Sequence, residues 1–297
     1  MSKPRVSIGM PVYNREKYVA ASIEAHLNQT YGDFELILTD NCSTDRSEEI
    51  CRDYAAKDSR IRYCRNLRNL GAAGNYRRCF ELATGEYFRW TPSDDLVSLN
   101  LLERAVDILD HDPSVFVAYP RTKLIDAEGN FTGDFDENLH LMDEQPSKRW
   151  IGVQQNIRLG NLHYGLNRAD QFRKTGLMRN YNGGDFPLIA EMSLYGKFYE
   201  IPDAFFYRRM HEEASSAMKS SADIMAFYDP QKRSKLFLYN WVHLGANLNS
   251  VRRAPISLIE KLKIAGFQAR SLVWSRREYS RELAGAVTYT VRKITRH

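Results

Sequence analysis

The chain has 297 residues, of which 43% are hydrophobic and 12% aromatic, enough for one large globular domain or a domain with an extension. Its four cysteines contain no Cys-x-x-Cys pair, which argues against a zinc site or a thioredoxin-like motif. The N-terminus lacks the apolar core of a signal peptide, and no run of about 18 uncharged apolar residues exists. We therefore expect a cytoplasmic protein.

The net charge of +5 is distributed unevenly along the chain. Residues 232–297 carry 14 Lys or Arg and 3 Glu, whereas the remaining residues carry 28 basic and 34 acidic side chains. An acidic body with a basic C-terminal region calls for a separate explanation of each part.

Strand and helix patterns alternate over the first 120 residues, and this alternation predicts a mostly parallel sheet flanked by helices. Asp45, with Glu48 three residues later, has the spacing of a helix-capping box. Pro11 is expected to close the first strand. The expected strands cover residues 6–10, 34–39, 61–64, 86–91 and 115–119. The expected helices cover residues 16–29, 45–57, 72–83 and 99–109.

The pattern becomes less regular in the second half. Residues 123–132 predict a hairpin that turns at residues 128–130. Residues 133–160 are polar and weakly periodic, which is typical of long loops with a short helix. Beyond about residue 215 we expect helices without clear strands.

Two adjacent carboxylates, Asp94 and Asp95, follow the aromatic-rich strand at residues 86–91. Acids just past such a strand lie at the carboxyl edge of a sheet, where open α/β folds place their ligands. Side-by-side carboxylates repel each other, and a divalent cation bound to their oxygen atoms relieves the repulsion. The alternative is a solvated turn, because Ser-Asp-Asp is ordinary turn chemistry.

Two further polar segments end strands on the same edge. They are residues 11–15 after the first strand and residues 40–45 after the second. Tyr13 can stack on a base, and Asp40 or Asn41 can bond the base edge or a ribose. Each segment alone also fits a simple helix-entry turn, but three polar loops on one edge favour a nucleotide site.

These segments resemble family 2 glycosyltransferases with the GT-A fold. The resemblance rests on residues 6–14, 22–31, 34–45, 69–71, 75, 83–87 and the Asp94-Asp95 pair, and it extends over about residues 5–215. It implies an α/β architecture with a mixed, mostly parallel sheet and a C-terminal helical extension. We accordingly expect a catalytic domain at residues 1–215 and a basic helical extension at residues 216–297. Within the domain, residues 1–120 would bind the nucleotide and residues 121–215 the acceptor.

The resemblance also implies roles for individual residues. Asp95 would ligate Mn²⁺ or Mg²⁺, with Asp94 nearer the donor's ribose or sugar. Many members of the family have two aspartates where this chain has Asp40-Asn41, and an amide at the second position does not by itself select uracil. The residues implied to surround the nucleotide are Pro11, Tyr13, Asn14, Arg15, Asp40, Asn41 and Asn75.

Asp185 is the expected catalytic base. It follows Gly183 and Gly184, which permit a tight turn before the next helix, and the segment resembles the catalytic-base region of the family. The alternative is a simple N-cap. Glu191 ranks second as a base, because six residues along a helix turn it away from Asp185, and it is expected to brace the helix or pair with a basic neighbour.

The run Tyr207-Arg-Arg-Met-His211 resembles the family's terminal Tyr-Arg-x-His stretch. A neutral imidazole at His211 can ligate the metal, and Arg208 can neutralise phosphate. His163 is a weaker candidate for lining an acceptor pocket.

The predicted function is therefore inverting transfer of a sugar from a nucleotide-diphosphate sugar, with a UDP-sugar favoured, to a saccharide or lipid-linked acceptor. Cell-surface polysaccharide, glycolipid or glycoconjugate synthesis is the expected setting. The alternatives are a sugar-nucleotide nucleotidyltransferase and a catalytically inactive sugar-nucleotide-binding protein.

The basic C-terminal helices either pack on the body or contact the inner face of a membrane peripherally. Nucleic acid is not expected as a partner, because no recognised motif accompanies the positive charge.

Overall fold

The computed structural model describes residues 3–214, 224, 227–230 and 238–294. Within them, one mixed sheet has the strand order β3-β2-β1-β4-β8-β6-β9-β5, with β7 paired to β6. The strands are β1 (Val6–Val12), β2 (Phe34–Asp40), β3 (Ile61–Arg65), β4 (Tyr87–Trp90), β5 (Leu96–Val97), β6 (Val115–Ile125), β7 (Phe131–Phe135), β8 (Leu166–Arg168) and β9 (Lys197–Arg209).

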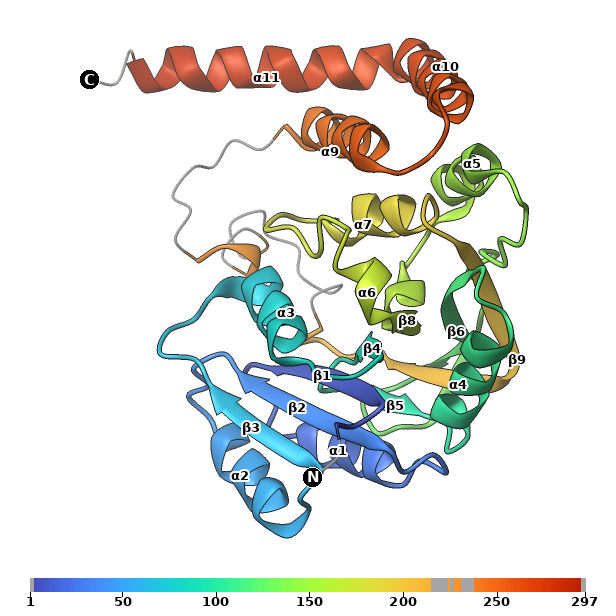
Figure 1. Cartoon of the computed structure of the whole chain (residues 1–297). Coiled ribbons are helices and arrows are strands. Elements are labelled where there is room, and N and C mark those ends of the chain that lie inside the picture. The colour runs from blue at the N-terminus through green and yellow to red at the C-terminus, as the bar shows by residue number, and fades with distance from the viewer. Residues whose placement is uncertain (1–2, 215–223, 225–226, 231–237, 295–297) are drawn as a thin grey trace.

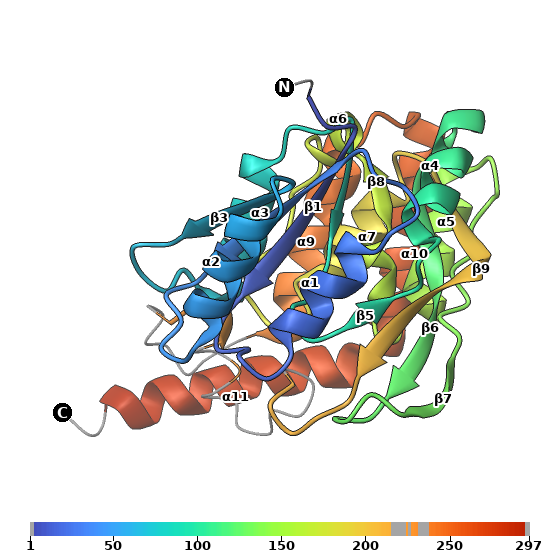
Figure 2. The same ribbon diagram turned by 90° about the horizontal axis from the view of Figure 1, so that it is seen from below.

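Helices cover both faces of this sheet (Figures 1 and 2). Helices α1, α2 and α4 pack on one face, and α3, α6 and α7 pack on the other, so that a hydrophobic core fills each side. The helices of this part are α1 (Val19–Leu27), α2 (Ser47–Lys57), α3 (Gly71–Leu82), α4 (Leu101–His111), α5 (Pro146–Asn156), the short 3₁₀ turn η1 (Asn161–Tyr164), α6 (Ala169–Phe172) and α7 (Asp185–Met192).

The first half of the sheet is parallel, as the alternating pattern predicted. Strand β1 pairs with β2 and β4, and β2 pairs with β3, all in parallel. The expectation that Pro11 ends the first strand is wrong, because β1 continues to Val12. The β1–β4 pairing stops at Gly9, so β1 has a paired neighbour on only one side at Pro11, where a residue without an amide hydrogen is tolerated.

The second half contains strands that the sequence analysis missed. Strands β6 and β9 run parallel over most of their length, and β8 lies antiparallel between β4 and β6. In β9 the residues Pro202 and Asp203 interrupt the strand-like pattern, and the β6–β9 register shifts there. The hairpin between β6 and β7 turns where expected, with Gly129 at a φ of 97°.

Two expected helix starts are wrong. Helix α1 begins at Val19 rather than at residue 16. Asp45 does not cap α2 through a capping box. Instead its carboxylate accepts bonds from the backbone N–H groups of Glu16 and Ser47, each at 3.0 Å, and so ties two loops together.

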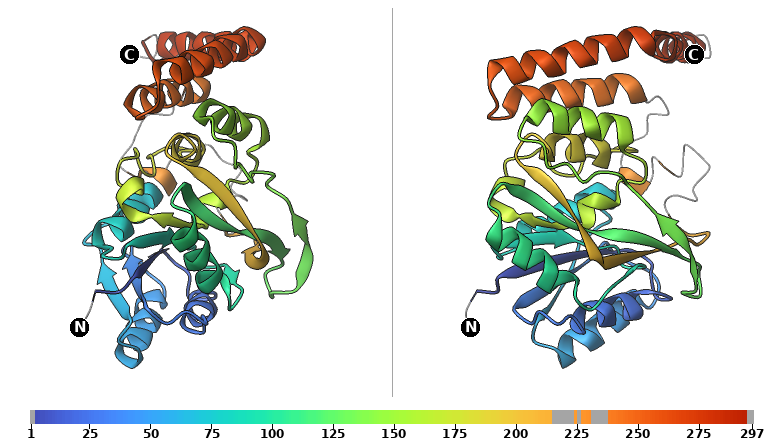
Figure 3. Two further views of the ribbon diagram at one scale, coloured as in Figure 1. Left: turned by 45° about the vertical axis from the view of Figure 1, so that its right-hand side comes forward. Right: turned by 90° about the vertical axis from the view of Figure 1, so that its right-hand side faces the viewer.

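The C-terminal region is helical and lies outside the helices that cover the two faces of the sheet. It consists of α9 (Tyr239–Arg253), α10 (Leu258–Trp274) and α11 (Arg276–Ile294). Helix α9 packs on α7, and α10 packs on α5. Figures 1 and 3 show α10 and α11 as the outermost layer, on the side of the molecule opposite α1 and α2. In the described part of the chain, no helix combines the length and the apolar character needed to cross a bilayer.

Candidate functional site

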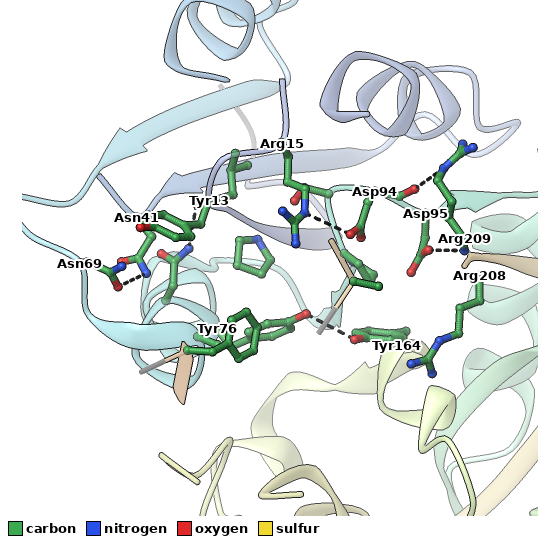
Figure 4. Close-up of a pocket in the computed structure, with 18 of the residues that line it drawn as sticks. Tyr13, Arg15, Asn41, Asn69, Tyr76, Asp94, Asp95, Tyr164, Arg208 and Arg209 are labelled. Atoms are coloured by element: carbon green, nitrogen blue, oxygen red, sulfur yellow. Dashed lines mark hydrogen bonds and ion pairs between the residues drawn. The ribbon is translucent and has the colours of Figure 1, made fainter. Parts of the chain in front are cut away.

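A cavity of about 440 Å³ lies at the carboxyl edge of the parallel strands. Its lining comes from the loops after β1, β2 and β4, from the start of α3 and from the end of β9. In Figure 4, Tyr13, Asn41 and Asn69 lie at one end of the cavity, and Asp94, Asp95 and Arg209 lie at the other. The cavity therefore has an aromatic and amide end and a charged end.

The loops after β1 and β2 are locked together. Asn14, at a φ of 51°, accepts a hydrogen bond from the backbone N–H of Thr44 at 2.9 Å through its Oδ1 atom. The backbone N–H of Arg15 donates to Ser47 Oγ at 2.7 Å. Asn14 itself is not part of the cavity lining, so in this structure it shapes the loop that presents Tyr13 and Arg15.

Asp40 also lies behind the cavity rather than in its lining. One carboxylate oxygen accepts from the backbone N–H of Ser43 at 2.8 Å. The other accepts from the Tyr63 hydroxyl at 2.7 Å and from Arg65 at 2.6 Å. The structure thus does not bring Asp40 to the position of a direct base contact, although it anchors the loop that begins with Asn41.

An amide network stiffens the wall beside Tyr13. Asn41 accepts from the backbone N–H of Leu70 at 2.9 Å and donates to Asn69 at 2.8 Å. Asn75 donates to the carbonyl oxygen of Thr39 at 2.8 Å. Asn41, Asn69 and Asn75 all line the cavity, and so does Tyr13, which is 39% exposed. This end of the cavity therefore places a partly exposed aromatic residue beside fixed amide groups.

At the other end of the cavity, Asp94 and Asp95 face different partners. Asp94 Oδ2 accepts from Arg15 Nε at 3.1 Å and lies 3.1 Å from His211 Nε2. Asp95 Oδ1 accepts from the backbone N–H of Arg209 at 2.6 Å. His211 is not part of the cavity lining, and its side chain is only 3% exposed.

The two carboxylates consequently differ in electrostatics. Burial raises the pKa of Asp95 well above its ordinary value, and the neighbouring charge of Asp94 adds to the rise. Burial would also raise the pKa of Asp94, but its contacts with His211 and Arg15 outweigh this effect and hold the pKa below its ordinary value. Asp95 is therefore the carboxylate whose negative charge the protein compensates least.

The donor set fits a divalent cation that also binds a substrate. Among the described residues, no group of three or more His, Cys, Asp or Glu side chains is arranged to hold a metal alone. Mg²⁺ commonly uses one or two carboxylates and takes its other ligands from phosphate and water. Asp95, with its raised pKa and a place in the cavity lining, fits such a partial site.

A second cavity, of about 320 Å³, adjoins the first and contains Asp185. The two cavities share Tyr76, Tyr164 and Arg208 in their linings. The hydroxyl groups of Tyr76 and Tyr164 lie 3.3 Å apart, as the dashed line in Figure 4 marks, and form the wall between the cavities. Arg208, held by Asn161 Oδ1 at 2.6 Å, can reach a ligand on either side.

Asp185 stands in the first turn of α7. Gly183, at a φ of 71°, makes the turn before it, and a side chain there would collide with the Tyr239 hydroxyl. Loss of contact with bulk water raises the pKa of Asp185 to about 6. A carboxylate with this pKa accepts a proton more readily than an exposed aspartate, which suits a general base.

The weaker candidates occupy different positions. Glu191 is fully buried and pairs with Arg253 at 2.6 Å and with Arg179 at 3.6 Å, away from both cavities. His163 lines the Asp185 cavity, and burial lowers the pKa of its imidazole to about 4, so it is neutral near pH 7. Its Nδ1 atom lies 2.5 Å from the carbonyl oxygen of Gly160.

Three cavity residues, Tyr76, Tyr164 and Arg209, were not among the site residues predicted from the sequence. Tyr76 directly follows Asn75, and Arg209 directly follows Arg208, so their positions beside candidate residues were the available signal. Nothing local to residue 164 indicated that its hydroxyl would meet that of Tyr76, because the two tyrosines come from segments 88 residues apart.

A mixed sheet with a polar cavity at the carboxyl edge of its parallel half, flanked by helices and followed by C-terminal helices, is the architecture of GT-A glycosyltransferases. Residues 7–148 match the model of the family described as Glycosyl transferase family 2. Over these residues the chain is similar to this family, as the motifs of its N-terminal half predicted.

Comparisons with individual proteins agree with this assignment. An uncharacterized glycosyltransferase of Methanocaldococcus jannaschii is 34% identical over 146 residues, which are 48% of this chain and 50% of that protein. Chondroitin synthase of Escherichia coli is 27% identical over 219 residues, 73% of this chain and 30% of that protein. The chain thus spans half or less of the length of these two relatives.

Among solved structures, S. aureus TarS residues 1–349 in complex with UDP-GlcNAc superposes with a TM-score of 0.65 at 19% identity. The match covers 92% of this chain and 74% of the TarS chain. At this identity the likeness concerns the fold.

Proposed function

We propose that the protein is an inverting glycosyltransferase that moves a sugar from a nucleotide-diphosphate sugar to an acceptor hydroxyl. The observation that carries the proposal is the pair of adjoining cavities. One offers an aromatic, amide-lined end and a charged end, and the other holds a carboxylate whose pKa is about 6. Two such cavities suit a donor in one and an acceptor in the other, with their reacting groups meeting where the cavities adjoin.

The donor would lie along the larger cavity. Tyr13 would stack on the base, with Pro11, Asn41 and Asn75 around the nucleoside. The diphosphate would extend toward Arg15, Arg208 and Arg209, whose guanidinium groups suit phosphate oxygens. Asp94 would lie near the ribose or the sugar, and Asn14 and Asp40 would support the site through the loops that they fix.

Asp95 would hold Mn²⁺ or Mg²⁺ together with the donor diphosphate, and His211 would orient Asp94 or add a ligand. A bound divalent ion supplies charge neutralisation for the departing nucleotide diphosphate. Arg208 and Arg209, placed at the same end of the cavity, would stabilise the same negative charge.

Asp185 would remove the proton from the acceptor hydroxyl. The freed oxygen attacks the anomeric carbon from the face opposite the diphosphate, the new glycosidic bond forms, and the bond from that carbon to the phosphate oxygen breaks. One displacement of this kind inverts the anomeric centre. His163, neutral at the floor of the same cavity, would contact acceptor hydroxyls.

The similarity to a chondroitin synthase and the fold shared with TarS, crystallised with UDP-GlcNAc, favour a UDP-sugar donor. The similarity to a chondroitin synthase also favours a saccharide acceptor in polysaccharide synthesis, and a lipid-linked acceptor is the second candidate.

The test measures binding and turnover in one series. UDP and GDP are titrated into the protein by calorimetry, with Mn²⁺ and with EDTA, and a panel of UDP-sugars is then assayed for UDP release. We expect UDP to bind in the presence of Mn²⁺ and to lose most of its affinity on chelation. Equal affinity with EDTA would contradict the metal site.

The same series separates the alternative functions. Release of pyrophosphate from a nucleoside triphosphate and a sugar 1-phosphate would identify a nucleotidyltransferase. Tight binding of a UDP-sugar with no turnover in the presence of each tested acceptor would indicate a binding protein that has lost its activity.

A further inference from the structure

The outward face of α10 is apolar along its whole length. Side chains three or four residues apart lie on one face of a helix. We define the outer stripe as the exposed residues that follow this spacing on α10: Leu258, Leu262, Ala265, Ala269 and Val273. Leu258 is 72% exposed, Leu262 62% and Val273 59%.

The stripe is not the face by which α10 packs on the protein. The inward face carries Ile264 and Gln268, which are 1% and 8% exposed, together with Phe267. Phe267 meets Trp150 of α5 at a ring distance of 6.0 Å. Helix α10 also contacts α9 and α11. A helix that is buried on its inner side alone would carry polar residues on its outer side. Helix α10 therefore has a second apolar face without a partner among the described residues.

Cations border the outer stripe. Lys261, whose Nζ donates to the backbone oxygen of Arg252 at 3.0 Å, lies on one side of it. Lys263, which pairs with Glu260 at 2.6 Å, and Arg270 lie on the other side. Glu260 has only 12% of its side chain exposed, and it is bonded to Lys263 and to the backbone N–H of Ser147. An apolar face edged by lysine and arginine is typical of helices that lie in the interface of an anionic membrane.

The neighbouring helix continues the same surface. Helix α11 starts with Arg276 and Arg277, both exposed and followed by one exposed acid, Glu278, and Trp274 at the junction is 71% exposed. Figure 3 shows α10 and α11 in one outermost layer although their axes cross, so a flat surface can touch both helices. A flat anionic surface suits this layer better than a groove or a single helix does.

We propose that the outer stripe of α10, with the basic start of α11, seats the protein on an anionic lipid surface. The stripe enters the boundary between head groups and acyl chains, and the flanking lysine and arginine side chains contact the phosphates. A second copy of the chain is a poorer occupant, because pairing two stripes about a twofold axis brings Lys261, Lys263 and Arg270 against their own copies. The inference goes beyond the proposed function, since lipid contact needs neither cavity.

The experiment is co-sedimentation of the full chain, without nucleotide, with vesicles of phosphatidylcholine alone or mixed with phosphatidylglycerol. We expect strong binding to the mixed vesicles and weak binding to the neutral ones. Replacing the three large stripe residues, Leu258→Gln, Leu262→Gln and Val273→Gln, is expected to reduce binding by roughly tenfold for each residue. Replacing Arg270→Gln and Arg277→Gln is expected to reduce binding to the mixed vesicles by about fivefold for each cation.

The matched control replaces three exposed apolar residues of the body, Leu67→Gln, Leu99→Gln and Phe131→Gln, and is expected to bind vesicles as the natural chain does. Circular dichroism checks that each variant is folded. Failure of the natural chain to bind anionic vesicles overturns the proposal. A natural chain that is dimeric in sedimentation velocity, while the stripe variant is monomeric, overturns it in favour of a second copy. Because vesicle binding and UDP release are measured separately, failure of either leaves the other standing.

Discussion

The paired aspartates Asp94 and Asp95 and the single aspartate Asp185 lie in adjoining cavities, but their surroundings differ in charge. The two carboxylates of the pair lie side by side. Asp94 contacts Arg15 and His211, and Asp95 accepts a hydrogen bond from the backbone N–H of Arg209. In the described part of the chain Asp185 forms no ion pair. The backbone N–H groups of Asp185 and Phe186 and the more distant Arg208 favour its charged form, but burial outweighs them and raises its pKa. Aspartate side chains thus stand in two different electrostatic environments in the two cavities.

The difference matches two kinds of chemistry. A carboxylate that exchanges a proton needs a pKa near the working pH, and loss of water alone provides this at Asp185. A carboxylate that binds a cation needs uncompensated negative charge, and burial together with the proximity of Asp94 provides it at Asp95. Environment rather than residue type therefore distinguishes the proposed base from the proposed metal ligand.

The strongest way to break the comparison is Asp185→Asn. Loss of a general base is expected to lower kcat by roughly 10²- to 10⁴-fold, while the affinity for UDP with Mn²⁺ stays nearly unchanged, because Asp185 does not line the donor cavity. The measurements are steady-state kinetics and calorimetry. The matched control is Asp170→Asn, which alters an exposed aspartate of the same half and is expected to keep full activity.

The same variant separates a base from a helix cap. Because folding raises the pKa of Asp185 from 3.8 to about 6, its charge opposes folding at neutral pH. That contribution is fully relieved below the unfolded pKa and appears as the pH rises through about 6. Asp185→Asn is therefore expected to raise the free energy of unfolding at pH 7, by about 3 kcal/mol at most. A loss of stability in Asp185→Ala, which removes the helix cap that an Asn would keep, would favour the capping alternative instead.

The counterpart at the other carboxylate is Asp95→Asn. We expect it to remove the Mn²⁺-dependent part of UDP affinity, a loss of at least the ~10- to 100-fold that follows disturbance of a metal's outer shell. It is also expected to raise the melting temperature of the metal-free protein, because Asp94 loses a like-charged neighbour. Asp134→Asn, on exposed β7, serves as the control in calorimetry. Unchanged dependence on Mn²⁺ in Asp95→Asn would place the metal elsewhere.

The donor side of the site was largely predictable because its residues follow strands within short segments. Asp94 and Asp95 after β4, and Tyr13 after β1, reach one edge simply because the strands are parallel. What was not predictable is which polar atoms are already used. Asp40 faces away from the cavity because Tyr63 and Arg65 of the next strand bind its carboxylate, and these partners are set by register rather than by local sequence.

In the cavity that contains Asp185, the sequence predicted this one residue but did not predict the cavity itself. The Gly-Gly-Asp turn indicated Asp185, since it is a local feature. The wall between the cavities depends on Tyr76 of α3 meeting Tyr164 of η1, and on β9 delivering Arg208. Strand β9 contains Pro202 and a shifted register, so its pattern did not predict a strand. Contacts between segments that are far apart in the chain are the feature of the site that local sequence patterns did not predict.

The finest separation of the two carboxylates uses pH and metal together. With donor and Mn²⁺ saturating, kcat is expected to fall about tenfold per pH unit below about 6, as Asp185 takes up a proton. His163 does not cause this fall in kcat, because burial lowers the pKa of its imidazole to about 4. The affinity for UDP should fall at low pH for a different reason, since a proton on Asp95 competes with the metal.

Raising the Mn²⁺ concentration should therefore lower the pH at which the UDP affinity falls, and it should leave the pH at which kcat falls unchanged. Parallel pH profiles of kcat and of UDP affinity, each at two Mn²⁺ concentrations, measure both shifts. If both pH values moved together, one shared titration would control the two cavities, and the division between a proton-accepting Asp185 and a metal-binding Asp95 would be wrong. If only the pH at which the affinity falls moves, the two carboxylates titrate independently across the wall formed by Tyr76 and Tyr164.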